Sequence, residues 1–192
     1  MLTYDLNQAE EKLILACLAN NPVAQKELYK RYAPKMFGVC LRYAMDRDQA
    51  ADLLQEGFIK VFDKLASFKK EGSFEGWIRR IMVNTALEHY RKRNHLYVIS
   101  IDDVDIIDET NEEEEDLLFQ LEITEVVKIM QQLSPGYRMV LNLYAMEGFS
   151  HKEIANHLGI SEGTSKSQLA RARAVLVEKI RNSLSKKVLR ET

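Results

Sequence analysis

The 192-residue chain lacks the features that would tie it to a membrane or to secretion. No apolar run approaches the roughly 18 residues that are needed to span a bilayer. The opening stretch MLTYDLNQAEEKL has no basic region followed by an apolar one, so we expect no signal peptide, no membrane insertion and a cytoplasmic location. The two cysteines, Cys17 and Cys40, are too few and too isolated for a disulfide framework or a zinc site, and we expect buried free thiols.

Motifs of catalysis are missing as well. The sequence has no Gly-rich phosphate loop and no setting for a nucleophile. Its histidines show no metal-ligand spacing and are scattered at His89, His95, His151 and His157. The sequence therefore predicts no catalytic residue, no cofactor and no metal, and an enzyme is the most distant of the functions that we considered.

Charge is distributed unevenly behind a net value of −2. Residues 1–95 carry 16 Lys and Arg against 12 Asp and Glu, residues 96–125 carry none against 12, and residues 126–192 carry 11 against 5. Five consecutive acids fill residues 112–116. Consecutive carboxylates repel one another and make a poor metal cage, so a flexible acidic linker over residues 96–117 is the favoured interpretation.

Residues 148–176 predict two short helices joined by a tight turn. Ser150 and Glu153 match the Ser-x-x-Glu capping box that begins a helix, and Gly159 can take the left-handed conformation that ends one. Ser161 then begins a second helix that carries basic side chains. This pattern is typical of a helix-turn-helix, whose second helix can enter the major groove of DNA. An ordinary helical hairpin with a solvated basic face is the alternative.

Apolar residues at helical spacing predict the remaining elements. They mark helices over residues 5–20, 22–44, 46–65, 74–93, 117–133 and 135–147, and no convincing strand. We therefore expect an all-α chain in which two helical domains, residues 1–95 and 118–192, are joined by the acidic linker.

Two of these helices carry a distinctive surface. The helix over residues 46–65 has an acidic and polar face, which is either solvated or bound to a partner. The helix over residues 74–93 carries the only tryptophan, Trp77, among several cations. Cations and an aromatic ring suit nucleic acid binding through phosphates and base stacking, whereas a core anchor is the alternative for Trp77.

Two separated stretches, taken together, resemble one family. The segment QAADLLQEGFIKVFDKLASFKKEGSFEGWIRRIMVNTALEHYRKR is similar to region 2 of bacterial sigma factors, and the segment LSPGYRMVLNLYAMEGFSHKEIANHLGISEGTSKSQLARARAVL is similar to region 4. The acidic linker stands where larger sigma factors have a third domain, which resembles the extracytoplasmic-function (ECF) group. The resemblance covers roughly residues 8–95 and 118–184.

The resemblance implies a role for each matching set of residues. The helix that docks on core RNA polymerase would contribute Asp52, Leu53, Gln55, Glu56 and Phe58. The loop and helix that capture the unstacked non-template strand of the −10 element would contribute Phe68, Lys69, Lys70, Ser73, Trp77, Arg80 and Asn84, with Arg91, Lys92 and Arg93 on upstream phosphates. The helix-turn-helix would read the −35 element as duplex DNA through Ser161, Thr164, Lys166, Ser167, Gln168, Arg171 and Arg173.

Three positions depart from the family's pattern. Ser165 and Gln168 stand where the family often has valine and arginine, and Gly57 stands where it commonly has an aliphatic residue. We expect Ser165 to weaken slightly the inner packing of the recognition helix. Because Gln168 changes a contact to a base or a phosphate, the −35 sequence stays open.

The resemblance thus implies a sigma factor that has no catalytic residues and gives core RNA polymerase its promoter specificity. Region 2 would recognise and melt the −10 element, and region 4 would read the −35 element. An anti-sigma factor, often membrane-anchored in this family, is a further expected partner. The main alternative is a stand-alone helix-turn-helix regulator that binds duplex DNA without polymerase and uses residues 1–95 for sensing or dimerisation.

Overall fold

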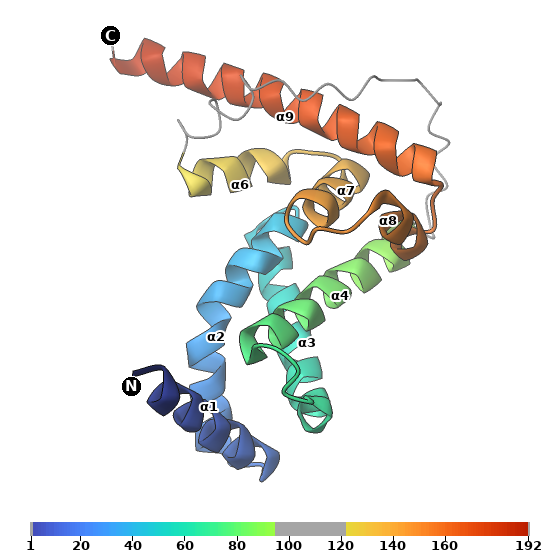
Figure 1. The fold of residues 1–192 in the computed structure, drawn as a ribbon. Helices are drawn as coiled ribbons and strands as arrows, with labels where there is room; N and C mark the ends of the chain where they lie inside the picture. The colour runs from blue at the N-terminus through green and yellow to red at the C-terminus, as the bar shows by residue number, and fades with distance from the viewer. Residues whose placement is uncertain (1, 95–121, 192) are drawn as a thin grey trace. The chain divides into compact units, whose positions relative to one another are not determined.

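The structure is a computed structural model that describes residues 2–94 and 122–191. The predicted acidic linker over residues 96–117 lies outside these described residues. Both described ranges are built from helices, which Figure 1 shows, and neither contains a strand. The prediction of an all-α fold with two helical regions is confirmed.

The described helices follow the predicted pattern closely. The first range contains α1 (Leu2–Leu18), α2 (Pro22–Tyr43), α3 (Arg47–Lys64), a short 3₁₀ helix η1 (Leu65–Ser67) and α4 (Phe74–Asn94). The second range contains α6 (Ile123–Gln131), α7 (Pro135–Ala145), α8 (His151–Leu158) and α9 (Glu162–Glu191). Of these, α9 differs most from expectation, because the predicted pair of short helices ends at residue 176 and the helix continues to Glu191.

The chain divides into two compact units. The first consists of Met1–Cys40 and Arg47–Ala86, and the second of Leu41–Asp46 and Leu87–Thr192. The predicted domain ends at residues 95, 96 and 117 fall in the range that the structure does not describe, so the division into residues 1–95 and 118–192 stays a prediction. Each unit is described by itself below.

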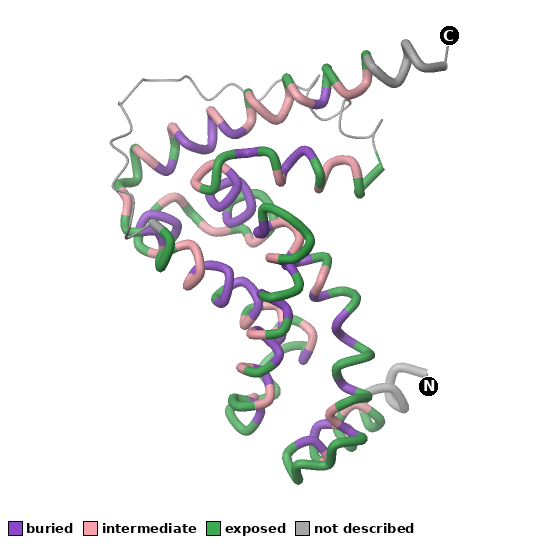
Figure 2. Tube along the Cα trace, turned by 180° about the vertical axis from the view of Figure 1, so that it is seen from behind, coloured by how far each residue is buried: buried purple, intermediate pink, exposed green. Residues whose placement is uncertain are grey.

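The core of the first unit lies among α2, α3 and α4. Buried residues recur at every third or fourth position along these helices, as the purple segments of Figure 2 show. Leu28, Val61, Phe74 and Ile78 are fully buried, and burying each such side chain contributes about 1.5–3 kcal/mol. Cys17 and Cys40 are buried free thiols, as predicted.

Gly57 allows α3 and α4 to approach each other closely. A Cβ added to Gly57 would overlap the Sδ of Met82, a residue of α4 that is 1% exposed. An aliphatic side chain at this position, which the family commonly has, requires Met82 to move or to be replaced by a smaller residue. The glycine at position 57, where the family commonly has an aliphatic residue, therefore leaves room for the large Met82 side chain opposite it.

The second unit contains the predicted helix-turn-helix, and its local signals are confirmed. Ser150 caps α8 and forms a reciprocal capping box with Glu153. Gly159 ends α8 in the left-handed conformation, at φ 69° and ψ 36°. Ser161 then begins α9, where its Oγ accepts a hydrogen bond from the backbone N–H of Thr164 at 2.9 Å.

The far half of α9 packs on α6, and Figure 1 shows the two helices side by side. Ile129 of α6 and Ile180 of α9 form a small buried cluster. The half-buried residues Val126, Leu176 and Leu184 surround that cluster. This apolar spacing continues beyond Leu176, which explains why α9 does not end with the helix-turn-helix.

Candidate nucleic-acid interface

Phe68 and Trp77, two residues of the predicted −10 site, lie beside a third aromatic ring, that of Phe74, which was not predicted there. Phe68 lies in the loop after η1, and Phe74 and Trp77 lie in the first turns of α4. The ring of Trp77 stacks on Phe74 with centroids 5.6 Å apart and an interplanar angle of 15°. Phe68 lies 5.0 Å from Phe74 and 5.5 Å from Trp77. We call Phe68, Phe74 and Trp77 the aromatic cluster.

Only part of the aromatic cluster is covered. Phe74 is 2% exposed and belongs to the core, whereas Phe68 and Trp77 are half-buried. Trp77 thus packs on the core through Phe74 without being fully enclosed by it. Base-on-aromatic stacking is worth roughly 1–3 kcal/mol per base.

Polar and cationic side chains lie on the same helix. Trp77, Arg80 and Asn84 follow the spacing that places side chains on one face of a helix, and Arg80 and Asn84 are exposed. The cations at the end of α4, which are Arg91, Lys92 and Arg93, are exposed as well. Positive charge thus continues along α4 from the aromatic cluster to its last turn.

The loop before α4 is anchored at both ends. The backbone N–H of Phe68 donates to the carbonyl of Leu65 at 3.1 Å, and the hydroxyl of Ser73 accepts from the N–H of Gly76 at 3.1 Å. Ser73 was predicted to contact DNA, and in the structure its hydroxyl caps the N-terminus of α4. At the tip, Lys69 is exposed, and Lys70 is paired with Glu11 of α1 at 3.0 Å.

The predicted polymerase-docking residues of α3 divide into a surface set and a core set. Asp52 and Gln55 are exposed, and Glu56 is half-buried. Leu53 and Phe58 are 2% and 3% exposed, so they support this face from beneath and offer no surface to a partner.

The predicted docking face includes one exposed apolar residue that was not assigned to it from the sequence. Ile59 is 56% exposed and lies one turn beyond Gln55. Glu56 is itself paired with Lys60, one turn on, at 2.8 Å. Ile59 follows Asp52 by seven residues, or about two helical turns, so this spacing could have placed it on the same face from the sequence alone.

The predicted −35 residues at the start of α9 differ in exposure and in hydrogen bonding. Lys166 is exposed to solvent. The hydroxyls of Ser161 and Thr164 lie 2.8 Å apart in the helix cap, and the hydroxyl of Ser167 donates to the carbonyl of Thr164 at 3.1 Å. Gln168 is 3% exposed and its Oε1 has no hydrogen-bond partner, so in this structure the side chain points away from solvent.

A series of side-chain contacts that was not predicted from the sequence connects α7, α8 and α9. The Nδ1 of His151 in α8 lies 2.9 Å from the Oγ of Ser165 in α9. The ring of His151 stacks on Tyr144 of α7 at 4.8 Å, and the guanidinium of Arg173 lies 5.7 Å from the centre of the Tyr144 ring. Arg171 and Arg173, both predicted to contact the −35 element, are half-buried.

The surroundings of two ionisable groups in the second unit shift their pKa values. The hydroxyl and the backbone N–H of Ser150 donate to Glu153, at 2.7 and 2.8 Å, and hold the pKa of this carboxyl below its usual value. Burial lowers the pKa of Arg138 in α7 to about 10, so Arg138 stays charged at neutral pH. Its Nη1 donates to the carbonyl of Gln131 at 2.8 Å.

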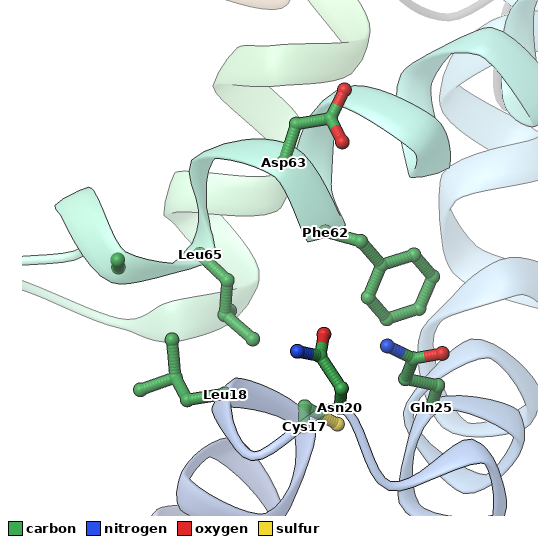
Figure 3. A pocket seen from close by; sticks show the side chains of 8 residues that line it. Cys17, Leu18, Asn20, Gln25, Phe62, Asp63 and Leu65 are labelled. Carbon is green, nitrogen blue, oxygen red and sulfur yellow. The ribbon is translucent and has the colours of Figure 1, made fainter.

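A pocket in the first unit carries no catalytic arrangement. It has a volume of about 340 Å³ and lies between the end of α1 and the end of α3. Asn20 and Gln25 extend their amides towards it, opposite Phe62 and Leu65 (Figure 3). Among the residues that the structure describes, no group of three His, Cys, Asp or Glu side chains could hold a metal ion. No helix in those same ranges has the length and apolarity to cross a membrane.

Comparisons with known protein families match both units. Residues 28–95 match the family described as Sigma-70 region 2, and residues 123–176 match the family described as Sigma-70, region 4. The first match contains the docking face and the aromatic cluster, and the second contains the helix-turn-helix.

Individual known proteins are similar to most of this chain. The ECF RNA polymerase sigma-E factor of Escherichia coli K12 is 31% identical over 164 residues, which are 80% of this chain and 84% of the relative. The ECF RNA polymerase sigma factor SigE of Mycolicibacterium smegmatis is 29% identical over 152 residues, which are 78% of this chain but only 59% of the relative's length. Among solved structures, the sigma factor RpoE of Bartonella quintana in complex with the anti-sigma factor NepR is similar, with 25% identity, a TM-score of 0.48, and coverage of 81% of this chain and 96% of that one.

Proposed function

Since the chain belongs to the ECF group of RNA polymerase sigma factors, we propose that it binds core RNA polymerase and directs promoter-specific transcription initiation. Its region 2 recognises and melts the −10 element, and its region 4 reads the −35 element. It contributes no catalytic residue, because the polymerase performs the chemistry. Its place of action is the cytoplasm, where polymerase and promoter DNA meet.

One observation carries the −10 assignment: the half-buried Trp77 stacks its ring on the buried Phe74 beside a loop with two lysines. A flipped base needs a fixed aromatic surface and nearby cations. The buried Phe74 fixes the orientation of Trp77, while Lys69, Lys70 and Arg80 supply positive charge for the backbone.

The −35 assignment is supported by the helix-turn-helix. Lys166 and Ser167 lie in the second turn of α9 and Arg171 lies one turn later, and all three are exposed or half-buried. A good bidentate contact to a base is worth about 1–3 kcal/mol of discrimination. For Gln168 to reach a base its side chain must first turn outward, which would also give its buried amide oxygen a partner.

Polymerase docking is assigned to the face of α3 that is formed by Asp52, Gln55, Glu56 and the exposed Ile59. Because the polymerase holds both DNA-reading regions on one particle, neither needs to bind DNA tightly alone. We expect weak DNA binding by the free chain. An anti-sigma factor, which can be membrane-anchored, is the further partner that we propose.

Reconstituted transcription tests the proposal. Purified chain is added to core polymerase of the source organism, and initiation is mapped on fragments of that organism's genome. We expect initiation from a set of promoters that core polymerase alone does not use. Absence of any such promoter, together with a tight footprint of the free chain on duplex DNA, would favour a stand-alone regulator, which no match supports.

A further inference from the structure

The tip of the loop between η1 and α4 contacts α1, a helix to which the sequence analysis gave no role. The Nζ of Lys70 lies 3.0 Å from the Oε1 of Glu11. Lys70 has a φ of 60°, in the left-handed region that residues other than glycine rarely adopt. Lys70 therefore combines an unusual backbone conformation with a side chain that is directed towards Glu11.

The residue before Glu11 connects α1 to the aromatic cluster. The carboxylate of Glu10 accepts a hydrogen bond from the hydroxyl of Tyr32 in α2. The ring of Tyr32 meets Phe74 edge-on, with centroids 5.5 Å apart. Burial of Tyr32 and its bond to Glu10 both raise the pKa of the hydroxyl, so the hydroxyl remains a donor to Glu10. Two successive carboxylates of α1 are thus linked to the two parts of the proposed −10 site: Glu10 reaches the aromatic cluster through Tyr32, and Glu11 contacts the loop tip directly.

The pair of Glu11 and Lys70 is suited to exchange. The side chain of Lys70 is 62% exposed and that of Glu11 is 47% exposed. An ion pair this exposed is weak and is screened by salt. A DNA phosphate offers the same ammonium an anionic oxygen, and its binding also releases counterions from the DNA. Replacing the carboxylate by a phosphate therefore costs little.

We propose that Glu11 occupies the place of a −10 phosphate: its carboxylate binds Lys70 in the free protein and yields Lys70 to the DNA backbone in the promoter complex. This inference rests on the −10 role proposed above for the loop. It makes α1 part of the promoter-reading machinery, in which Glu11 lowers the affinity for the −10 strand by competing for Lys70.

The experiment compares full-length variants in complex with core polymerase. The probe is a fluorescent single-stranded oligonucleotide that carries the non-template −10 strand of a promoter used by the unsubstituted protein. Glu11→Gln frees Lys70. Glu75→Gln is the matched control, because Glu75 is paired with Lys35 at 2.7 Å and their side chains are similarly exposed, at 44% and 65%. Any gain from Glu75→Gln measures the general effect of removing one negative charge.

We expect Glu11→Gln to tighten oligonucleotide binding about two- to fivefold beyond the control. In a Lys70→Gln background the additional gain should disappear. Lys70→Gln alone should reduce the slope of log affinity against log salt by about 0.7, the value for one contact to a single-stranded phosphate. A purely structural role for the pair would not change that slope.

Equal effects of Glu11→Gln and Glu75→Gln, or a gain from Glu11→Gln that survives in the Lys70→Gln background, would overturn the inference. So would an unchanged salt slope for Lys70→Gln. These outcomes leave the proposed function intact as long as the unsubstituted complex initiates transcription. Thermal unfolding of each variant confirms that the comparison is made between folded proteins.

Discussion

The hydroxyl of Ser165 is fully buried and lies 2.9 Å from the Nδ1 of His151, so one hydrogen bond joins the two helices of the helix-turn-helix. The family often has valine at this position, and its absence suggested weaker inner packing. The structure shows a polar contact in place of the apolar one. The orientation of the recognition helix α9 therefore depends on a specific pair of side chains.

Replacing Ser165 with valine should destabilise the second unit by about 1–3 kcal/mol, because His151 loses its partner in a half-buried position. Urea unfolding measures the change. Ser167→Ala is the control, since it removes a hydroxyl whose acceptor lies within the same helix, and it should cost under about 1 kcal/mol. In a His151→Phe background most of the cost of the valine should disappear. A Ser165→Val protein as stable as the original would contradict this role.

Relative to Gly38→Ala, replacing Gly57 with alanine should destabilise the first unit by about 1 kcal/mol, because the new methyl group overlaps the end of the buried Met82 side chain, which must shift within the core. Thermal unfolding of Gly57→Ala, and of the double variant with Met82→Ala, measures the effect. The double variant should lose less than the sum of the two single changes. Gly38→Ala is the control, since an added Cβ there meets no atom within 4 Å. Additive losses in the double variant would rule out the proposed overlap.

Replacing Trp77 with alanine should slow formation of the open promoter complex roughly 5- to 150-fold, the equivalent of one lost base stack. Binding to the −35 duplex should change little. Trp77→Phe keeps a ring over Phe74 and should retain much of the activity. Permanganate footprinting of melted thymines measures the first step, and gel shifts of a −35 duplex measure the second. Equal loss of both would indicate unfolding of the protein.

Reversing the charge of Asp52 or Glu56 to lysine should weaken binding to core polymerase tenfold or more, about 1.4 kcal/mol, while leaving helicity intact. Glu27→Lys makes the same charge change at an exposed position of α2 and serves as the control. Fluorescence titration with core polymerase measures the affinities. Should the α3 variants bind like Glu27→Lys, the docking face lies elsewhere.

The cap of α8 should weaken in acid. Bonds from Ser150 lower the pKa of Glu153, so the cap's contribution is present above the ordinary glutamate value of about 4.3 and is lost as pH falls through the lowered pKa. Protection of the Ser150 amide, measured as the exchange rate relative to the intrinsic rate at each pH, should therefore fall as pH drops through the lowered pKa of Glu153. In Glu153→Gln this loss of protection should be absent, because the side-chain amide does not titrate in that range. A matching loss of protection in both proteins would assign the effect to global unfolding.

The sequence was sufficient for the elements whose signals are local. Ser150, Glu153, Gly159 and Ser161 each act within a few residues of their own position, and the structure has them in the predicted caps. The helical spacing of apolar residues likewise located the described helices. Local hydrogen bonding and periodicity are properties of the chain itself, and they can be read without knowing the fold.

Tertiary contacts were not accessible in this way. Glu11 and Lys70 are 59 positions apart, and Ser165 and His151 are 14 apart, so no spacing rule connects them. Resemblance assigned Leu53, Phe58 and Gln168 to interfaces because it aligns positions, but it does not report which way a side chain points. Burial then separated the surface of each proposed site from its support.

The long helix α9 has a consequence for where region 4 ends as a folding unit. The family match stops at residue 176, which is also where the helix-turn-helix pattern ends. Ile180 lies beyond this limit and is fully buried against Ile129 of α6. A fragment cut at the family boundary keeps every residue proposed to touch the −35 element, yet it strips α6 of its main apolar partner. The smallest fragment of the second unit that can fold by itself must therefore include Ile180, the residue on which α6 packs. This fragment is about one helical turn longer than the family match, although the residues proposed to contact DNA all lie before residue 176.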